Sequence, residues 1–270
     1  MNIGLIAGSG QFPILFSKAA KLKGHRVVAV AFKHETDPHI EAHVDAVDWQ
    51  HLGQVNRLIR YFRKHQVTDA VMLGAIRKTR MFVDVRPDTK AIALLSQMRT
   101  THDDGLLGAF ARVLEKEGIA VRASTFLLPE MLAPEGVWTR RKPGRSDKKD
   151  ISEGFRLAKE IGRLDIGQCI VIKDGSVLAV EAIDGTDATI RRGGVLGRGD
   201  AVVVKVSKPD QDMRFDVPAV GVETIRTMQE AGARILVIEA GKAVVFDREE
   251  MVRLADQHGI VIVSLNDGVI

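Results

Sequence analysis

The first half of this 270-residue chain alternates short apolar runs with longer amphipathic segments, and most of the runs are bounded by glycine. Residues 2–6 and 26–31 are two such runs, separated by a helix-like stretch that Gly24 ends. The pattern returns at 54–65, which has one apolar face, and at the strand-like run 69–73. This alternation indicates parallel βαβ units and predicts a doubly wound α/β sheet. A further helix is expected at 105–117 and a further strand at 119–122.

The composition changes at residues 139–149, a polar and strongly basic segment that contains Pro143 and Gly144. Such a segment is typical of a boundary between domains. We therefore predict an N-terminal domain over 1–135, a basic linker over 136–150 and a C-terminal mixed α/β domain over 151–270. A basic strip close to a phosphate or a lipid head group is the alternative for the linker.

The second half carries two Gly-containing pairs that predict β-hairpins. Asp174-Gly175 lies between the apolar runs 169–173 and 176–183, and an Asp-Gly pair in that context is a strong hairpin signal. Ala240-Gly241 suggests a second hairpin from 235–239 to 242–246. The other expected elements are strands at 201–206 and 260–263 and helices at 222–231 and 248–258.

Charge and cysteine content narrow the class of protein. The net charge of +4 suits an anionic ligand or lipid surface, but it is too weak and too dispersed to indicate a nucleic-acid partner. Cys169 is the one cysteine, so no intrachain disulfide forms, and its apolar surroundings favour a buried side chain in a reducing compartment. No signal peptide and no run of about 20 apolar residues is evident, so a cytoplasmic location with at most peripheral membrane contact is expected.

A glycine turn follows the first expected strand and opens a helix, which is the setting of many phosphate sites. Its residues are Gly8, Ser9, Gly10 and Gln11. The turn is not a complete dinucleotide motif, because Pro13 occupies the place of the third glycine. The second strand also ends on Phe32 without the ribose-binding acid, and Glu35 comes only later. A nicotinamide cofactor is therefore disfavoured, and a tight turn without a ligand is the alternative.

Two further polar groups follow or precede expected elements of the first half. Arg77 and Lys78 come after the strand 69–73, where they could hold a phosphate or be exposed loop charges. Asp103 and Asp104 directly precede a helix, and there an N-cap is the default role. A metal or water-orienting role for these carboxylates is the alternative.

The acid-rich segment 181–187 combines Glu181, Asp184 and Asp187, and two arginines follow it at 191–192. Carboxylate oxygens suit Mg²⁺, and arginine suits phosphate. Glu181 is expected inside an apolar strand, where a carboxylate is costly unless it is paired. The segment is therefore a candidate site for metal-assisted phosphate chemistry.

A polar candidate segment begins at the end of the strand 201–206 and runs from Lys205 to Pro218 as a loop. It is dense in Lys, Asp and Arg, and it contains Pro209 and Pro218. Long polar loops at strand ends commonly carry catalytic groups, and the two prolines stiffen this one. A solvated loop without a function is the alternative.

Four motifs of the chain resemble the LpxI family. They are GLIAGSGQFP, THDDGLL, VLAVEAIDGTDATIRR and KVSKPDQDMRFDVPAVGVETI, and they occur in the order found in that family. The resemblance covers nearly the whole chain. One departure is Asp184, where the family pattern leads us to expect glutamate, so Asp184 is not assigned as the central catalyst.

The resemblance implies a cytoplasmic hydrolase of lipid A biosynthesis that acts at the inner face of the inner membrane. Such an enzyme cleaves UDP-2,3-diacylglucosamine to 2,3-diacylglucosamine 1-phosphate (lipid X) and UMP, with water attacking the β-phosphorus. The resemblance further implies dependence on Mg²⁺ or another divalent cation such as Mn²⁺. It also implies a Rossmann-like N-terminal domain, a C-terminal domain particular to the family, substrate between them, and a homodimer.

The resemblance also suggests residue roles. Asp216 is the first choice for the family's essential aspartate and Asp212 the second. Catalytic, metal-binding or water-orienting roles fall to Asp216, Glu181 and Asp187, with Asp212 as an alternate. The expected substrate-binding residues are Gly8, Ser9, Gly10, Gln11, Asp104, Thr186, Arg192, Lys208 and Arg214.

Two other functions stay open from the sequence. A nucleotide-sugar sensor would bind a UDP-sugar without turnover, although it would have little use for so many carboxylates. An NAD(P)-dependent oxidoreductase depends on the glycine turn alone, and detectable nicotinamide binding would support it.

Overall fold

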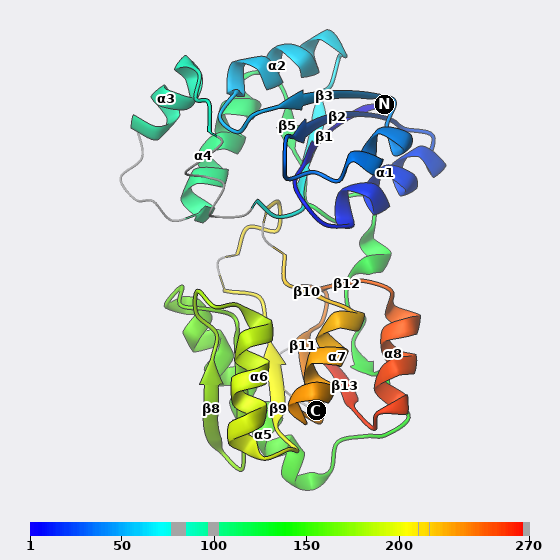
Figure 1. Cartoon of the computed structure of the whole chain (residues 1–270), viewed down its shortest axis with the longest axis vertical. Helices are drawn as coiled ribbons and strands as arrows, with labels where there is room; N and C mark the ends of the chain where they lie inside the picture. Colours follow the sequence, from blue (N-terminus) through cyan, green and yellow to red (C-terminus); the bar gives the residue numbers. More distant parts are fainter. Residues whose placement is uncertain (77–84, 97–102, 210, 216, 267–270) are drawn as a thin grey trace. The chain divides into compact units, whose positions relative to one another are not determined.

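The computed structural model of the chain describes residues 1–76, 85–96, 103–209, 211–215 and 217–266 (Figure 1). The chain forms two compact units. The first unit comprises Met1–Leu128 together with Asp212–Asp216, and the second comprises Pro129–Gln211 and Val217–Ile270. The polar loop after the strand 201–206 is therefore shared between the units.

The first unit is built on a five-stranded parallel sheet with the strand order β3-β2-β1-β4-β5. This is the order of the first five strands of a Rossmann sheet, and it confirms the predicted doubly wound domain. The strands are β1 (Asn2–Ala7), β2 (Arg26–Phe32), β3 (Ala46–Gln50), β4 (Asp69–Leu73) and β5 (Ala120–Val121).

Helices cover this sheet and bury one apolar face each. The helix α2 (Val55–Lys64) packs Leu58, Ile59 and Phe62 into the core between sheet and helices. Gly4 in β1 makes this packing possible, because a Cβ atom there would lie 2.9 Å from the Phe62 ring. The helical elements are α1 (Phe12–Leu22), η1 (Pro38–His43), α2 (Val55–Lys64), α3 (Thr89–Ser96) and α4 (Asp103–Lys116).

The second unit contains a six-stranded mixed sheet with the order β6-β13-β11-β9-β7-β8. The three central strands β9, β11 and β13 are parallel, whereas β6, β7 and β8 run antiparallel to their neighbours. The strands are β6 (Gly136–Val137), β7 (Cys169–Lys173), β8 (Ser176–Val180), β9 (Val202–Lys205), β11 (Ile235–Glu239) and β13 (Val261–Leu265). The β7–β8 pair confirms the hairpin predicted at Asp174-Gly175.

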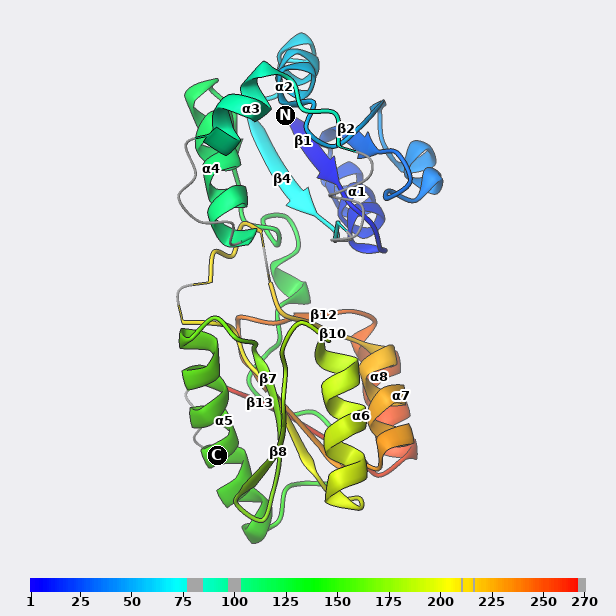
Figure 2. The same ribbon diagram turned by 60° about the vertical axis from the view of Figure 1, so that its left-hand side comes forward.

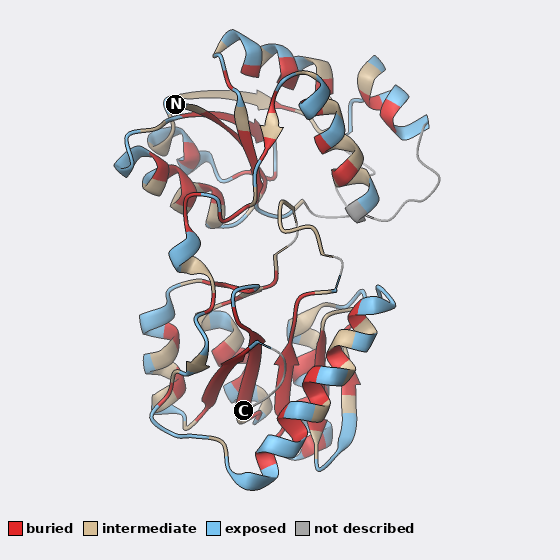
Figure 3. Ribbon diagram, turned by 180° about the vertical axis from the view of Figure 1, so that it is seen from behind, coloured by how far each residue is buried: buried red, intermediate tan, exposed pale blue. Residues whose placement is uncertain are grey.

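Four helices and one 3-10 turn complete the second unit. Figure 2 shows α5 on one face of the sheet and α6, α7 and α8 on the other. Each face has its own apolar core, and the strands β7, β9, β11 and β13 between them are almost wholly buried (Figure 3). The elements are η3 (Pro129–Met131), α5 (Arg145–Arg163), α6 (Thr186–Gly197), α7 (Val222–Ala231) and α8 (Arg248–Gln257).

The structure corrects the basic linker predicted over 136–150. These residues form β6 and the first turns of α5 inside the second unit. Asp147 accepts a hydrogen bond from the Gly144 amide at 2.7 Å, and Asp150 accepts bonds from the Asp174 and Gly175 amides at 2.8 and 2.7 Å. Both carboxylates are buried, so the segment is part of the domain although its composition is that of a linker.

The hairpin predicted at Ala240-Gly241 is wrong. The Ala240 amide donates to Leu265 at 2.8 Å instead of turning the chain back on β11. The following strand β12 (Val244–Val245) pairs in parallel with β10 (Ala219–Val220). β11 is already flanked by β9 and β13, which leaves no edge for a hairpin partner.

Candidate active site at the carboxyl edge of the second sheet

The two acid- and base-rich segments of the C-terminal half meet at one edge of the second sheet. The parallel strands β9 and β11 end at this edge with Lys205 and Glu239. Cys169, the first residue of β7, is the register partner of Lys205, and the Glu181 amide donates to the Cys169 carbonyl at 2.8 Å. The turn after β8 therefore lies at the same edge, which is where open α/β sheets bind ligands.

The Glu181 side chain is buried, and each of its carboxylate oxygens accepts a hydrogen bond. β8 ends at Val180, so Glu181 follows the strand and does not lie within it as predicted. Its carboxylate accepts from the Thr186 hydroxyl at 2.7 Å and from the Gln168 amide at 3.2 Å. These bonds offset the cost of burial and fix the entry into α6. The predicted metal role of Glu181 and substrate role of Thr186 stay predictions.

Arg192 and Asp184 close the turn between β8 and α6. The Arg192 guanidinium donates to the Asp184 carboxylate and, at 2.8 Å, to the Val180 carbonyl. The hydrogen bond from Arg192 holds the pKa of Asp184 below its ordinary value. Arg192, predicted to bind phosphate, therefore has two partners within the protein. Asp187 is exposed in the first turn of α6, where a negative charge is favourable.

Two charged residues to which the sequence analysis gave no role of their own, Glu239 and Lys205, also lie at this edge. Glu239 is buried and forms ion pairs with the Lys159 and Lys242 ammonium groups at 3.0 Å each. It also accepts from the Ser207 amide at 2.8 Å. Lys205 is buried as well, and its ammonium donates to the Ala219 carbonyl at 2.8 Å. The available signal was a single charge at the end of an apolar run, in VVVK and ILVIE.

Burial and nearby charges determine the pKa of the Cys169 thiol. Its thiol is fully buried, as the sequence predicted, and burial is the main cause that raises its pKa. Glu181 and Asp187 raise the pKa further, whereas Lys205 lowers it. A buried thiol with a raised pKa is a poor nucleophile, so Cys169 is a core residue. The register pairing of Cys169 with Lys205 and the hydrogen bond from the Glu181 amide to Cys169 place these two charged residues at the start of β7.

The polar loop after β9 is held by its own side chains. The Gln211 side-chain oxygen accepts from the Lys208 amide at 2.9 Å and from the Ser207 hydroxyl at 3.0 Å. Lys208, a predicted phosphate ligand, forms an ion pair with Asp165. These contacts hold Ser207, Lys208 and Gln211 together within the described part of the loop.

Within the first unit, Arg214 is held between two carboxylates. Its guanidinium donates to Asp212 at 2.7 and 2.9 Å and to Glu115 at 2.9 Å. The hydrogen bond from Arg214 is the main reason that the pKa of Asp212 is lowered. The Arg214 guanidinium therefore already has carboxylate partners in this structure, and its predicted role in substrate binding stays a prediction. Asp216, the first choice for the essential aspartate, lies outside the described residues.

The glycine turn of the first unit binds the end of β4. The Gly8 amide donates to Leu73 at 2.7 Å, and the Ser9 amide donates to Ala75 at 2.8 Å. A Cβ atom at Gly8 would lie 2.6 Å from the Ala75 carbonyl oxygen, so close approach of two backbones explains the glycine. The phosphate cradle predicted here thus loses two of its donors. Gly10 and Gln11 are exposed, and their substrate-binding role stays a prediction.

The side-chain contacts of three other predicted residues, Arg77, Lys78 and Asp104, cannot be described. Arg77 and Lys78 lie outside the described residues, and so does the side chain of Asp104, which is in α4. Over the described ranges, no group of three His, Cys, Asp or Glu side chains could hold a metal ion. The predicted set of Glu181, Asp187 and Asp216 therefore cannot be assembled from the described residues.

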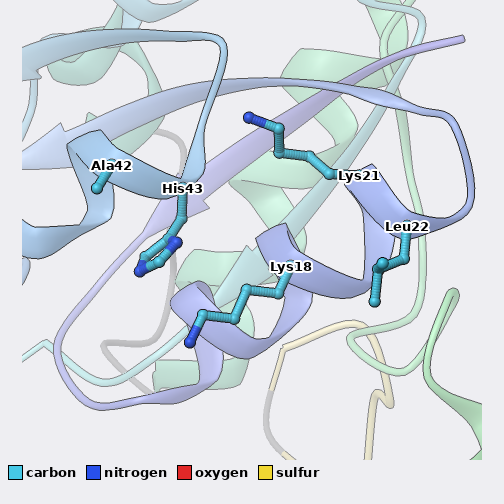
Figure 4. Close-up of a pocket in the computed structure, with 5 residues that line it drawn as sticks. All are labelled: Lys18, Lys21, Leu22, Ala42 and His43. Carbon is cyan, nitrogen blue, oxygen red and sulfur yellow. The ribbon is translucent and has the colours of Figure 1, made fainter.

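A hollow of about 460 Å³ on the first unit is lined by Lys18, Lys21, Leu22, Ala42 and His43 (Figure 4). It lies at the C-terminal ends of α1 and η1, towards the amino ends of the strands. Because ligands of such sheets bind at the opposite edge, this hollow is not the candidate site. No helix among the described residues is long and apolar enough to cross a bilayer.

Sequence profiles identify both halves of the chain. The profile of the LpxI N-terminal domain matches residues 2–131, and that of the LpxI C-terminal domain matches residues 134–263. The chain belongs to the LpxI family. It is 30% identical over 276 residues to the protein named UDP-2,3-diacylglucosamine pyrophosphatase LpxI from Caulobacter vibrioides (strain ATCC 19089 / CIP 103742 / CB 15), covering 98% of each chain. The resemblance stated from the four motifs is thereby confirmed.

Solved structures of other proteins are only distantly similar. CobK precorrin-6A reductase matches with a TM-score of 0.32 and 12% identity, covering 98% of this chain and 88% of its own. The biotin carboxylase domain of a thermophilic 2-oxoglutarate carboxylase matches with a TM-score of 0.28 and 15% identity. That match covers 63% of this chain, which spans about a third (34%) of the carboxylase chain.

Proposed function

We propose that this chain hydrolyses UDP-2,3-diacylglucosamine to lipid X and UMP in lipid A biosynthesis. The observation that carries the proposal is the end-to-end match to a relative that is named as the pyrophosphatase for this substrate. Membership of the family favours a hydrolase over a sensor without turnover and over an NAD(P)-dependent oxidoreductase. The missing third glycine and the occupied amides of Gly8 and Ser9 further disfavour a dinucleotide cofactor.

We assign the chemistry to the carboxyl edge of the second sheet and the polar loop that follows β9. Cleavage of a pyrophosphate requires neutralisation of charge on both phosphates and a water molecule held in line. Asp216 is the proposed general base, with Asp212 as its alternate. What supports Asp216 is that Asp212 is held by Arg214, whose hydrogen bonds make its carboxylate a weak base.

Dependence on Mg²⁺, or on another divalent cation such as Mn²⁺, is part of the proposal. Mg²⁺ in phosphate chemistry is commonly held by one or two carboxylates together with substrate oxygens and water. Asp187 is exposed at this edge and is the proposed first ligand, whereas Glu181 already binds two protein donors. Isothermal titration of the protein with Mg²⁺, with and without UMP, tests this. Binding that survives Asp187→Asn unchanged would remove Asp187 from the metal site.

Phosphorus NMR of UDP-2,3-diacylglucosamine, incubated with protein and Mg²⁺ in ¹⁸O-labelled water, tests the reaction itself. We expect lipid X and UMP, with the label in lipid X because water attacks the β-phosphorus. A label in UMP would keep the activity but move the attack to the α-phosphorus. Tight substrate binding without cleavage would favour the sensor, and neither binding nor cleavage would refute the proposal.

Substitution of Asp216 by alanine tests the proposed base. We expect turnover to fall by about 10²-fold or more, the range that general-base catalysis contributes. Asp212→Asn is the matched comparison, since it removes the alternate carboxylate while keeping its shape. Near-normal turnover of the Asp216 variant, together with loss in the Asp212 variant, would reverse the assignment.

Two further parts of the proposal concern assembly and location. We propose that the protein forms a homodimer. We also propose that it associates peripherally with an anionic bilayer, because the substrate carries acyl chains. Sedimentation velocity measures the first, and co-flotation with phosphatidylglycerol vesicles measures the second. Full activity on micellar substrate without any flotation would speak against surface association.

A further inference from the structure

Lys205 differs from the other lysines at the carboxyl edge of the second sheet. It is only 9% exposed, yet among the described residues no carboxylate lies within ion-pair distance of its ammonium. Within the described parts of the chain, its ammonium donates one hydrogen bond, to the Ala219 carbonyl at 2.8 Å. By contrast, Lys159 and Lys242 share Glu239, and Lys208 pairs with Asp165.

A buried ammonium in this condition is incompletely compensated. The group has three N–H donors and a full positive charge, whereas Ala219 offers one neutral acceptor. Burial of a charge is costly unless the charge is paired and hydrogen-bonded. Glu181 is not the missing partner, because its carboxylate accepts from Thr186 and Gln168 and forms no ion pair with Lys205 in the described structure. The position therefore calls for an anion from outside the protein.

The surroundings of Lys205 suit such an anion. Lys205 lies two residues after Val203, so both side chains are on the sheet face that α6, α7 and α8 cover. α6 begins after Gly185 and α7 after Gly221, and both helices start at the carboxyl edge, close to where β9 ends. Helix N-termini favour negative charge, which adds to the attraction of the ammonium.

We propose that Lys205 binds a phosphate group of the substrate. The proposal deepens the proposed function, on which it rests for the identity of the ligand. In this arrangement the ammonium keeps its bond to Ala219 and uses its other donors for phosphate oxygens. Lys205 is then a binding residue for the pyrophosphate, and a stability cost in the free protein is relieved when the substrate binds.

The test compares Lys205→Met with Lys173→Met. Lys173 lies at the opposite end of the neighbouring strand β7, and its ammonium donates to two carbonyls, Gly197 at 2.8 Å and Gly199 at 3.0 Å. Each protein is titrated calorimetrically with inorganic pyrophosphate and with UMP, its thermal unfolding is recorded, and kcat and KM are measured on UDP-2,3-diacylglucosamine.

We expect Lys205→Met to weaken pyrophosphate binding ten-fold or more and to lower kcat/KM at least as much. Its unfolding temperature should be unchanged or higher, because methionine removes a buried charge. Lys173→Met should bind as the wild type does. Unchanged pyrophosphate binding in Lys205→Met would overturn the proposal, and a lower unfolding temperature with unchanged binding would make Lys205 a tether for β10.

A second measurement does not need the methionine variant to fold. Lysine labelled with ¹³C at Cε gives one NMR signal per side chain, and the signal absent in Lys205→Arg is that of Lys205. We expect pyrophosphate to shift this signal in the wild type, and no shift at saturation would overturn the proposal. Pyrophosphate binding through Lys205 without cleavage of the lipid substrate would uphold this inference and refute the proposed function instead.

Discussion

Replacement of Glu239 by glutamine should destabilise the second unit strongly. The carboxylate is almost fully buried and serves Lys159, Lys242 and the Ser207 amide at once. Glutamine keeps the shape but leaves the Lys159 ammonium, whose side chain is 25% exposed, without its counter-charge. Breaking a buried ion pair typically costs about 3–5 kcal/mol. Because Lys159 keeps its bond to the Ser207 carbonyl at 2.9 Å, we expect the lower end of that range.

Urea unfolding followed by tryptophan fluorescence measures this cost. The chain has two tryptophans, Trp49 in the first unit and Trp138 in the second, so a Trp49→Phe background reports on the second unit alone. With a urea dependence of about 2 kcal/mol per M, a loss of about 3 kcal/mol lowers the midpoint by about 1.5 M. The control is Lys242→Met, whose side chain is 52% exposed. An exposed pair contributes at most about 1 kcal/mol, so its midpoint should move by less than about 0.5 M.

The reasoning also predicts the double variant. Lys159→Met in the Glu239→Gln background removes the orphaned ammonium, so it should recover part of the lost stability. A midpoint shift below about 0.5 M for Glu239→Gln alone would refute the view that this carboxylate compensates buried charge. A further loss in the double variant would show that the aliphatic packing of Lys159 matters more than its charge.

Three more outcomes follow from single contacts. Gly74→Ala should destabilise the first unit by more than about 2 kcal/mol, since the added Cβ atom would lie 2.3 Å from a backbone oxygen. In Gly24→Ala the added Cβ atom has no heavy atom within 4 Å, so the variant should lose only about 1 kcal/mol through backbone strain. Chemical unfolding of both variants compares the two losses. Arg214→Met should raise the pKa of Asp212 towards its ordinary value, as measured by ¹³C NMR of the carboxyl carbon. In the wild type, the lowered pKa of Asp212 contributes stability at pH values above the pKa that Asp212 has in the unfolded chain. This stability is lost as the pH falls through the pKa of Asp212 in the folded protein. Cys169 should resist iodoacetamide at pH 8 in the native protein and react after unfolding, and modification of the folded protein would contradict its burial.

The fold could be predicted where local pattern and tertiary environment agree. The buried parallel strands are runs of branched apolar residues, and Asp174-Gly175 supplies the backbone conformation of a tight turn. The helix α6, which contains Gly193 and Gly194, was not predicted from the sequence. In the structure these glycines let α6 approach its neighbours, since a Cβ atom at Gly193 would lie 2.4 Å from Val171 and one at Gly194 would lie 2.2 Å from the Ala231 carbonyl oxygen. Close packing between elements is not visible in a local sequence window.

The sequence predicted the region of the candidate site, but it did not predict which of the charged residues there already have partners within the protein. The motifs at 181–187 and after β9 were expected to carry charge for the reaction, and they do meet at one sheet edge. Sequence cannot tell which charges are already used inside the protein. Glu181 binds Thr186, and Arg192 binds Asp184, so two of the selected residues hold the turn before α6.

Lys205 and Glu239 show what decides between a structural and a functional charge. Both are single charges that end an apolar strand, and nothing in VVVK or ILVIE distinguishes them. Among the residues that the structure describes, Glu239 contacts two ammonium groups and a backbone amide, whereas the Lys205 ammonium contacts one carbonyl. A charge that is compensated inside the protein contributes to stability, and one that is not has a cost that only a ligand can relieve. On this argument the uncompensated Lys205 is the strand-end charge at which the anionic substrate should bind.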